Sequence, residues 1–376
     1  MPWEACSVTQ KRKEFVLLAG SPGVNLSQLA SRFGISRKTA YKWLERSREQ
    51  PQIDQALQDR SRRPRCSPRQ SLPEVELLVL QLRQAYDWGG RKISHVLSRD
   101  HALQVAPSTV TSILHRHGQI RPEDSNASKA WLRFEHARPN ELWQMDFKGD
   151  FPLAQGRCYP LTAVDDHSRF NLILQACSNQ RRSTVQAQLE RAFAMYGLPE
   201  RINTDNGPPW GTGGQGEFSM LGVWLMRLGI KLSHSTPWHP QSNGKDERFH
   251  RSLKRELLRH HEWVDLPQAQ TKFDDWRHIY NEQRPHEALE MQTPVQRYRP
   301  SKRSMPSTLP EPDYEAWAQV RKVQHGGWVH FQGREIRLSK ALAGQPVAFM
   351  PRPERDGAYD VYFCQQHLKV VHLGAR

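Results

Sequence analysis

Apolar residues recur at three- and four-residue spacing between residues 25 and 33, which predicts one face of an amphipathic helix. Gly34 follows as a turn, and Ser36 can cap a second helix over residues 37 to 46. The pattern predicts a helix-turn-helix unit, whose second helix enters the major groove of DNA, with a plain three-helix bundle as the alternative. The outward residues of the second helix that we expect to contact DNA are Arg37, Lys38, Thr39, Tyr41 and Lys42.

A second helical unit is predicted over residues 71 to 120. Its apolar positions indicate a helix from Glu74 to Tyr86 and an interruption at the Gly89-Gly90 pair. Ile93, Val96 and Leu97 then mark a second helix, and a third begins at Pro107 and stops near Gly118. Two such units in tandem suit a long, bipartite DNA site. The residues of the last helix that we expect to face DNA are Thr109, Ser112 and Arg116.

Between these units the periodicity breaks, and the segment from Arg60 to Arg69 holds five arginines, two prolines and no acid. One interpretation is a solvated linker. The other, which we favour, is an extended arm that lies along phosphates or in a minor groove. The arginines of this segment that we expect to contact DNA are Arg60, Arg62, Arg63 and Arg65.

Strand-like and helix-like patterns alternate through residues 141 to 300. A strand over residues 142 to 147 precedes a hairpin that turns at residues 165 to 168, and a helix expected to be capped by Ser183 comes next. Further strands are predicted at residues 201 to 204 and 230 to 234, with helices beside them. This order predicts a mixed sheet flanked by helices.

The last part of the chain contains short β-like runs separated by glycine-containing turns, which predicts a small β-barrel. A proline-rich break precedes it. We therefore expect a multidomain protein with two all-α helix-turn-helix units, a central α/β domain and the barrel. The boundaries are 1–50 and 71–120 for the helical units, 51–70 for the Arg-rich linker, 121–140 and 301–313 for the other linkers, 141–300 for the α/β domain and 314–376 for the barrel.

Charge and composition narrow the partners of the 376-residue chain. Its 54 Lys and Arg against 39 Asp and Glu give a net charge of +15, which suits a polyanion such as nucleic acid. A membrane surface is the lesser alternative, because apolar runs reach only about five residues and a spanning helix needs ~20. The five cysteines form no Cys-x-x-Cys pair. They are typical of reduced thiols in a cytosolic protein.

Three acidic residues stand in distinctive settings. Asp146 and Asp205 end strand-like apolar runs, whereas Glu247 opens a basic amphipathic helix. Carboxylates gathered at close range need a positive charge to offset their repulsion, and two divalent cations supply it in enzymes that act on phosphodiesters. For an isolated Glu247 the ordinary alternative is an exposed helical pair with Arg251, but the two aspartates reverse that preference.

Other acids compete for these roles. Asp246 is the neighbour of Glu247 but points about 100° away on a helix, and we interpret it as part of a helix cap that begins at Asn243. Asp165 and Asp166 fall at the hairpin turn, where aspartate is favoured for turn formation. The Arg284-Pro285-His286 segment is interpreted as structural.

Residues 143–146 (Trp-Gln-Met-Asp), 204–207 (Thr-Asp-Asn-Gly) and 239–250 (His-Pro-Gln-Ser-Asn-Gly-Lys-Asp-Glu-Arg-Phe-His) resemble the integrase-core transposases of bacterial insertion sequences. The resemblance implies an RNase H-like fold and an Asp-Asp-Glu triad that binds two Mg²⁺ ions, with Mn²⁺ as a substitute. In this sequence the triad would be Asp146, Asp205 and Glu247. The absence of Cys and His clusters agrees with magnesium. Residues near the triad that would contact or position DNA are Asn243, Lys245, Arg251 and Lys254.

The sequence departs from retroviral integrases in two respects. Residues 211–216 lengthen the distance between the second and third acids, which we interpret as a loop insertion. The retroviral zinc-binding amino-terminal domain has no counterpart, so the helix-turn-helix units would recognise the element ends.

The resemblance implies a DNA transposase that binds terminal inverted repeats, cleaves them and joins them to target DNA, acting as a multimer in the bacterial cytoplasm at the nucleoid. One alternative is a catalytically silent, transposase-derived DNA-binding regulator. A second is a ribonuclease of the same fold, which tandem major-groove readers disfavour.

Overall fold

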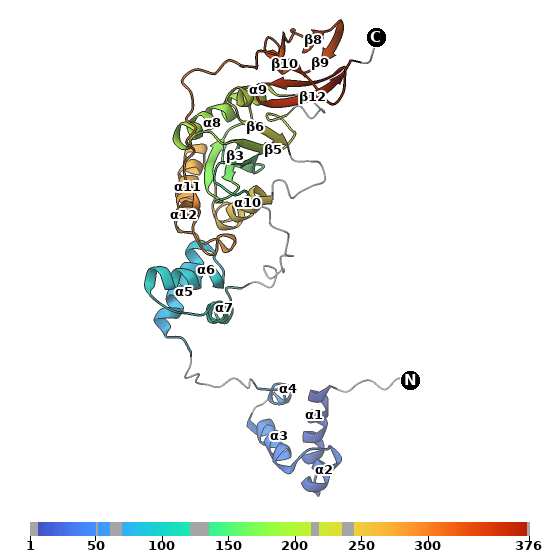
Figure 1. Ribbon diagram of the computed structural model, residues 1–376. Helices are drawn as coiled ribbons and strands as arrows, with labels where there is room; N and C mark the ends of the chain where they lie inside the picture. Colours follow the sequence, from blue (N-terminus) through green and yellow to red (C-terminus); the bar gives the residue numbers. More distant parts are fainter. Residues whose placement is uncertain are drawn as a thin grey trace. The chain divides into compact units, whose positions relative to one another are not determined.

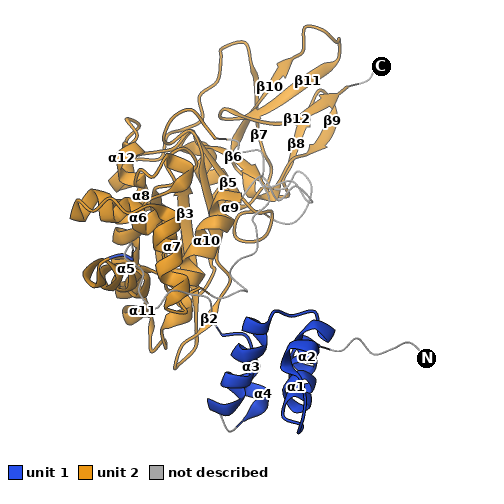
Figure 2. Ribbon diagram, turned by 90° about the horizontal axis from the view of Figure 1, so that it is seen from below, with its two compact units in different colours: residues 1–71 blue, residues 72–376 orange. Residues whose placement is uncertain are grey.

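The computed structural model describes residues 7–49, 52–60, 70–120, 135–211, 218–234 and 244–373. The chain divides into two compact units, residues 1–71 and residues 72–376 (Figure 2). No helix among the described residues combines the length and apolar character that a membrane span requires. The predictions that lie outside the described residues concern Arg62, Arg63, Arg65, Asn243 and the loop at 212–216.

The first unit is helical around a small core of its own. Its helices are α1 (Val8–Ala19), α2 (Leu26–Arg32), α3 (Arg37–Glu49) and α4 (Ile53–Ala56). Phe15, Ala30 and Ala40 are buried together between α1, α2 and α3. The Ser36 hydroxyl accepts the backbone N–H of Thr39 at 3.2 Å. This bond is the expected cap, so the predicted helix-turn-helix pair α2–α3 is confirmed.

The short helix α4 lies in a segment that the sequence indicated to be irregular. This helix has only 4 residues, too few to show a helical period, which explains why the sequence pattern did not predict it. Leu57 after it is fully buried, and the Arg12 side chain donates to the Leu57 carbonyl at 2.8 Å. The chain therefore closes the first unit beyond the expected end of the second helix.

The second unit begins with three helices, α5 (Pro73–Tyr86), α6 (Gly90–His101) and α7 (Pro107–Arg116). Val79, Ile93 and Val110, one from each helix, are buried together. All three predicted helices are confirmed. Proline starts both α5 and α7 because it lacks the N–H that a first helical residue leaves without a partner.

A mixed sheet follows, and Figure 1 shows its strands flanked by helices. The main strands are β1 (Trp143–Phe147), β3 (Arg157–Asp165), β4 (Asn171–Cys177), β5 (Arg201–Thr204) and β6 (Lys231–His234). β4 pairs with β3 and β3 with β1, both antiparallel, whereas β1, β5 and β6 run parallel. The short β2 (Phe151–Pro152) pairs with the start of β3. The predicted hairpin and mixed sheet are confirmed.

Helices cover both faces of this sheet because its strands bury side chains on both sides. Trp143 and Met145 of β1 pack in a cluster with α8 (Arg182–Tyr196) and α9 (Met220–Arg227). On the opposite face, side chains of β3 and β4 pack against α10 (Gly244–Glu256) and α11 (Leu266–His278). The intervening residues of β1, Gln144 and Asp146, therefore face α10, because side chains alternate along a strand.

Some local predictions were wrong or incomplete. Ser183 is not the cap of α8, whose N-cap is Arg181 and makes no side-chain cap bond. The sequence pattern did not identify α11 or the elements around it. These are the 3₁₀ helices Leu258–His260 and Glu287–Leu289, the π-helix Ile279–Gln283 and α12 (Pro294–Arg297).

The carboxy-terminal strands form two sheets that do not close into the expected barrel among the described residues. One is the antiparallel sheet β12-β11-β10-β7 and the other is the hairpin β8-β9. The strands are β7 (Gln319–Lys322), β8 (Trp328–Phe331), β9 (Arg334–Arg337), β10 (Pro346–Pro351), β11 (Ala358–Phe363) and β12 (Gln366–His372). The Phe331 and Phe349 rings stack at 3.9 Å, so the hairpin packs on the sheet through side chains. Alternation predicted the strands but could not specify their partners.

Candidate active site

Asp146 lies on β1, and Asp205 is the residue that follows the neighbouring parallel strand β5. Gln144 of β1 is in register with Asn203 of β5. Asp146 and Asp205 each lie two residues beyond this pair, toward the carboxyl ends of strands that are roughly 4.8 Å apart. Two of the three acids that the sequence singled out therefore lie at the same edge of the sheet.

Glu247 approaches the same place from α10. It lies in the first turn of this helix and is exposed. Its charge reaches Asp146, because the negative charges of Asp205 and Glu247 both raise the pKa of Asp146. Burial is the larger cause, and together these effects raise the pKa of Asp146 to about 6. Burial also raises the pKa of Asp205, against a backbone N–H donated by Gly207. Such a group of carboxylates favours a bound cation.

The raised pKa of Asp146 predicts how divalent ions affect stability. Below pH of about 6 the Asp146 carboxyl keeps its proton, which a metal ion must displace, and above it the ionised form repels its acidic neighbours until an ion binds. The free energy of unfolding of the metal-free protein should therefore fall as pH rises from about 4, near the ordinary pKa of an aspartate, to about 6. The increase in melting temperature caused by Mn²⁺ should be large near pH of about 7.5 and nearly absent near pH of about 5. Thermal unfolding of the wild type and of Asp146→Asn checks this, and an unchanged increase at both pH values contradicts it.

Asp246 does not form part of a cap through its side chain, so that interpretation was wrong. Its carboxylate is fully buried beneath Thr162 of β3, whose hydroxyl lies 3.1 Å from Asp246 Oδ1 and 2.9 Å from the Asp146 carbonyl oxygen. His250 Nε2 lies 2.7 Å from the same hydroxyl. Burial lowers the pKa of His250 to about 3, so the ring is neutral and its contact with Asp246 is a hydrogen bond.

Among the described residues, Asp146, Asp246 and His250 offer ligand atoms that all lie within 4.8 Å of one another. Burial and the charge of Asp146 raise the pKa of Asp246 well above its usual range. The Thr162 hydroxyl has one hydrogen and faces several acceptors, so a neutral Asp246 carboxyl can donate where the hydroxyl cannot. We therefore assign Asp246 and His250 to the hydrogen-bonded support of Asp146.

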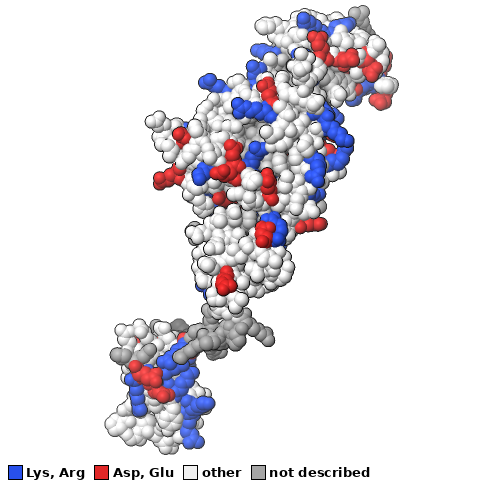
Figure 3. Space-filling model, turned by 90° about the vertical axis from the view of Figure 1, so that its left-hand side faces the viewer, with Lys and Arg blue, Asp and Glu red and all other residues white. Residues whose placement is uncertain are grey.

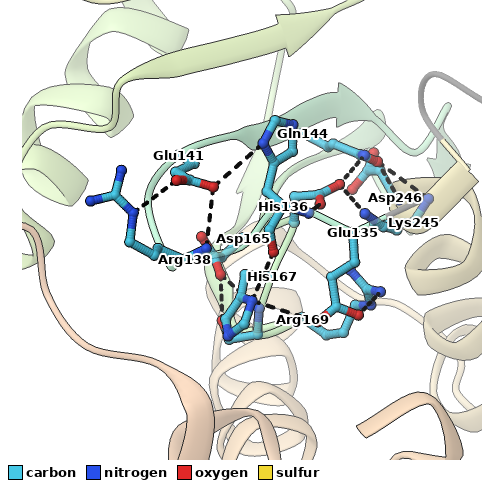
Figure 4. A network of polar contacts seen from close by, with 12 residues as sticks. Glu135, His136, Arg138, Glu141, Gln144, Asp165, His167, Arg169, Lys245 and Asp246 are labelled. Atoms are coloured by element: carbon cyan, nitrogen blue, oxygen red, sulfur yellow. Dashed lines mark hydrogen bonds and ion pairs between the residues drawn. The ribbon is translucent and has the colours of Figure 1, made fainter. Parts of the chain in front are cut away.

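The aspartates of the hairpin have different roles. Asp165 accepts the backbone N–H of Ser168 at 2.8 Å and its hydroxyl at 2.6 Å, which confirms the turn interpretation. Asp166 instead accepts from the Gln144 amide at 2.9 Å and pairs with the Lys245 ammonium. Figure 4 shows Gln144, Lys245 and Asp246 close together in this network. Asp166 thus connects the hairpin to the start of α10.

The expected DNA contacts of the first unit fall largely on its surface. Arg37, Lys38 and Lys42 are exposed, Tyr41 is 61% exposed, and Thr39 is partly buried beside Ser36. Figure 3 shows Lys and Arg side chains of this unit on the face in view. Arg60 is exposed and lies 3.5 Å from a Glu49 carboxylate oxygen. The outer face of α3 is therefore open to a partner.

Helices α5 to α7, where the sequence predicted a second helix-turn-helix unit, expose fewer of the residues expected to contact DNA than the sequence indicated. Arg116 pairs with the buried Glu76, which also contacts His117 at 2.9 Å. Thr109 is partly buried, and the Ser112 hydroxyl is exposed but donates to the Ser108 carbonyl at 2.9 Å. On α10, Arg251 and Lys254 are exposed, whereas Lys245 is turned toward Asp166.

Sequence patterns did not single out Gln144 or Thr162, and placed Asp166 and Asp246 in local roles. Through their hydrogen bonds, all four residues help to connect β1, which carries Asp146, to α10, which carries Glu247. Alternation along β1 could have shown that Gln144 shares a face with Asp146. Nothing local identifies a partner about 100 residues away in the chain.

Family models match five parts of the chain. Residues 11–65 match a helix-turn-helix domain and residues 39–114 a homeodomain-like domain. Residues 136–240 and 228–294 match two models of an integrase core domain. Residues 318–376 match the C-terminal domain of IS481 family transposases.

Curated relatives include proteins of bacterial insertion elements. The chain is 31% identical over 160 residues to the Insertion element IS476 uncharacterized 39.2 kDa protein of Xanthomonas euvesicatoria, which covers 42% of this chain and 44% of that protein. It is 33% identical over 159 residues to the Insertion element IS407 uncharacterized 31.7 kDa protein of Burkholderia multivorans, covering 42% of this chain and 54% of that protein. The chain thus spans about half the length of these relatives.

A solved structure of the HTLV-2 integrase catalytic core domain in complex with magnesium is 19% identical and covers 43% of this chain and 99% of its own, with a TM-score of 0.34. A likeness at this score supports no conclusion about this chain. The order of the matched domains and the relatives from insertion elements are more informative, and both agree with the resemblance of the three motifs. The matched domains, in the order helix-turn-helix, integrase core and IS481 transposase C-terminal domain, are similar to those of insertion-sequence transposases with an integrase-type core.

Proposed function

We propose that this protein binds the terminal inverted repeats of its insertion element, cleaves the DNA there and joins the ends to target DNA. The observation that carries the proposal is the effect of Asp205 and Glu247 on Asp146, because their negative charges both raise the pKa of Asp146. Asp146 is on β1, Asp205 follows the parallel strand β5, and Glu247 is in the first turn of α10. Carboxylates that repel one another in this way are suited to divalent cations.

The donor set fits magnesium, because all three groups are carboxylates and hard oxygen ligands suit Mg²⁺. We propose that Asp146, Asp205 and Glu247 hold two Mg²⁺ ions, with Mn²⁺ as a substitute. When bound there, the ions activate a water or a DNA 3′-hydroxyl and stabilise the departing 3′ oxygen of an in-line displacement. Thr162 and Asp246 keep the backbone of Asp146 fixed against α10.

The basic surface residues would hold DNA around this site. Arg37, Lys38 and Lys42, which are exposed on α3, would contact a major groove and its phosphates, with Thr39 and Tyr41 between them. Arg251 and Lys254, exposed on the helix of Glu247, would hold the strand that is cut. Helices α5 to α7 and the arginines of residues 60–65 would extend the contact along the repeat. Arg116 can join them only by leaving Glu76.

Joining two ends to one target requires both ends in one complex, so we propose a multimer assembled on double-stranded DNA. The site of action would be the bacterial nucleoid in the cytoplasm.

The experiment uses a duplex oligonucleotide that carries the inverted repeat found in the DNA flanking the gene. With Mg²⁺, the purified protein should nick the repeat end and join its 3′-hydroxyl to a second duplex, and chelation of the metal should stop both steps. Retention of the oligonucleotide without any nicking would favour the catalytically silent regulator. Cleavage of an RNA–DNA hybrid in preference to the repeat would favour a ribonuclease.

A further inference from the structure

Gln144 lies two residues before Asp146 on β1, and both side chains face α10 rather than the cluster around Trp143. The Gln144 side chain is almost completely buried, with 3% of the residue exposed. A buried amide must use its hydrogen-bonding groups within the protein. Its partners therefore reveal what the residue does.

The side-chain oxygen of Gln144 accepts hydrogen bonds from the first turn of α10. The backbone N–H groups of Lys245 and Asp246 both donate to Gln144 Oε1, each at 3.2 Å. The first N–H groups of a helix have no partner within the helix, and a side-chain oxygen that accepts them fixes the helix start. Here an acceptor for these N–H groups comes from the strand that carries Asp146.

The other end of the Gln144 amide is also engaged. Its nitrogen donates to Asp166 Oδ1 at 2.9 Å, and the Lys245 ammonium pairs with the same carboxylate. Asp166 is fully buried and also accepts the backbone N–H of His136 at 2.9 Å. Gln144, Asp166 and Lys245 therefore form a closed ring in which the backbone and side chain of Lys245 are both held.

We propose that this ring is a positioning clamp that sets the rotation and height of α10 over β1, so that Glu247 reaches the ions held by Asp146. Glu247 is two residues beyond Lys245 in the first turn of α10, so a shift of the helix start moves its carboxylate directly. The proposal rests on the proposed function, and it assigns Lys245 to positioning rather than to a DNA phosphate. A displacement of about 1 Å in such a site costs on the order of 100-fold in rate.

The test compares Gln144→Met, Asp166→Asn and Lys245→Met with the wild type by calorimetric titration of Mn²⁺ and by joining rate at increasing Mn²⁺. We expect the clamp variants to bind Mn²⁺ about tenfold or more weakly and to join DNA about 10- to 100-fold more slowly, with rate partly restored by added Mn²⁺. Binding of the repeat oligonucleotide should stay unchanged. Gln144→Glu, which keeps the acceptor for α10 but loses the donor to Asp166, should fall between Gln144→Met and wild type.

Lys254→Met is the matched control, because Lys254 is a lysine on the same helix but is exposed. It should weaken DNA binding and reduce its salt dependence, with Mn²⁺ affinity unchanged. If Lys245→Met behaves like Lys254→Met, Lys245 is a phosphate contact and the clamp is overturned. If Gln144→Met does not fold, Asp166→Asn and Lys245→Met decide the question.

The two proposals fail in distinguishable ways. A wild-type protein that never joins DNA refutes the proposed function, while the Mn²⁺ titrations still report on the clamp. Equal Mn²⁺ affinity in wild type and all clamp variants overturns the clamp even if the wild type is fully active.

Discussion

Replacing Glu247 with glutamine should abolish cleavage and joining of the repeat end, with a loss of about 10³-fold or more. The amide is a poor ligand for a divalent ion, and the loss of several kcal/mol of charge stabilisation corresponds to a thousandfold or greater change in rate. Glu247 is exposed, so the fold does not depend on it. The same substitution removes a negative charge that raises the pKa of Asp146, so the metal-free variant should be at least as stable as the wild type.

Joining is measured with the repeat duplex in Mg²⁺, and end binding by retardation of the same duplex. Glu262→Gln serves as the control, because Glu262 is another exposed glutamate, beyond the end of α10. It should leave both activities intact. Joining by Glu247→Gln within tenfold of the wild type would remove Glu247 from the site.

Replacing Glu256 with alanine should destabilise the catalytic domain by about 3–5 kcal/mol. The Arg284 guanidinium donates to both Glu256 oxygens, at 2.7 and 3.0 Å, and the two side chains are only 9% and 5% exposed. Removal of one partner leaves a buried charge without compensation. Burial and then the charge of Arg284 lower the pKa of Lys92 to about 7, whereas Glu256 raises it, so the loss of Glu256 favours the neutral form of Lys92 and leaves the charge of Arg284 without its partner.

Denaturant unfolding, followed by a signal from the catalytic domain, gives the change in free energy. Arg138→Met is the comparison, because Arg138 is 71% exposed in its pair with Glu141, and the loss of such an exposed pair should cost far less stability than the loss of the buried pair. The double variant Glu256→Met with Arg284→Met should recover most of the stability. A cost for Glu256→Ala no larger than that for Arg138→Met would show that this pair is not needed.

The sequence pattern correctly predicted the helices and strands whose own residues show a regular spacing of apolar positions. The strand at residues 201–204 and the helices α2, α5 and α7 appear where they were expected. By contrast, α11 and the π-helix after it were missed. The π-helix changes the helical period just before Arg284, which a search for a single period does not detect.

The candidate site was foreseeable in part. The three acids could be selected from their settings, and parallel pairing of β1 with β5 explains why Asp146 and Asp205 come together. The partner of a buried polar group is set by the tertiary fold, so the contact of Asp246 with Thr162, 84 residues away, left no local pattern. Lys245 is the clearest example. A lysine in a basic helix suggests DNA, whereas the fold gives it a carboxylate.

The core of the first unit is formed by residues of that unit, from Phe15 to Leu57, and the unit ends by residue 71. Its folding therefore does not require the sheet that carries Asp146. A gene copy that acquired a stop codon anywhere in the later domains would still encode a folded helical module with Arg37 and Lys38 on its surface. Under the proposed function, such a fragment would keep the proposed DNA contacts of α3 but lack the proposed catalytic residues, and it would compete with the intact protein for the element ends.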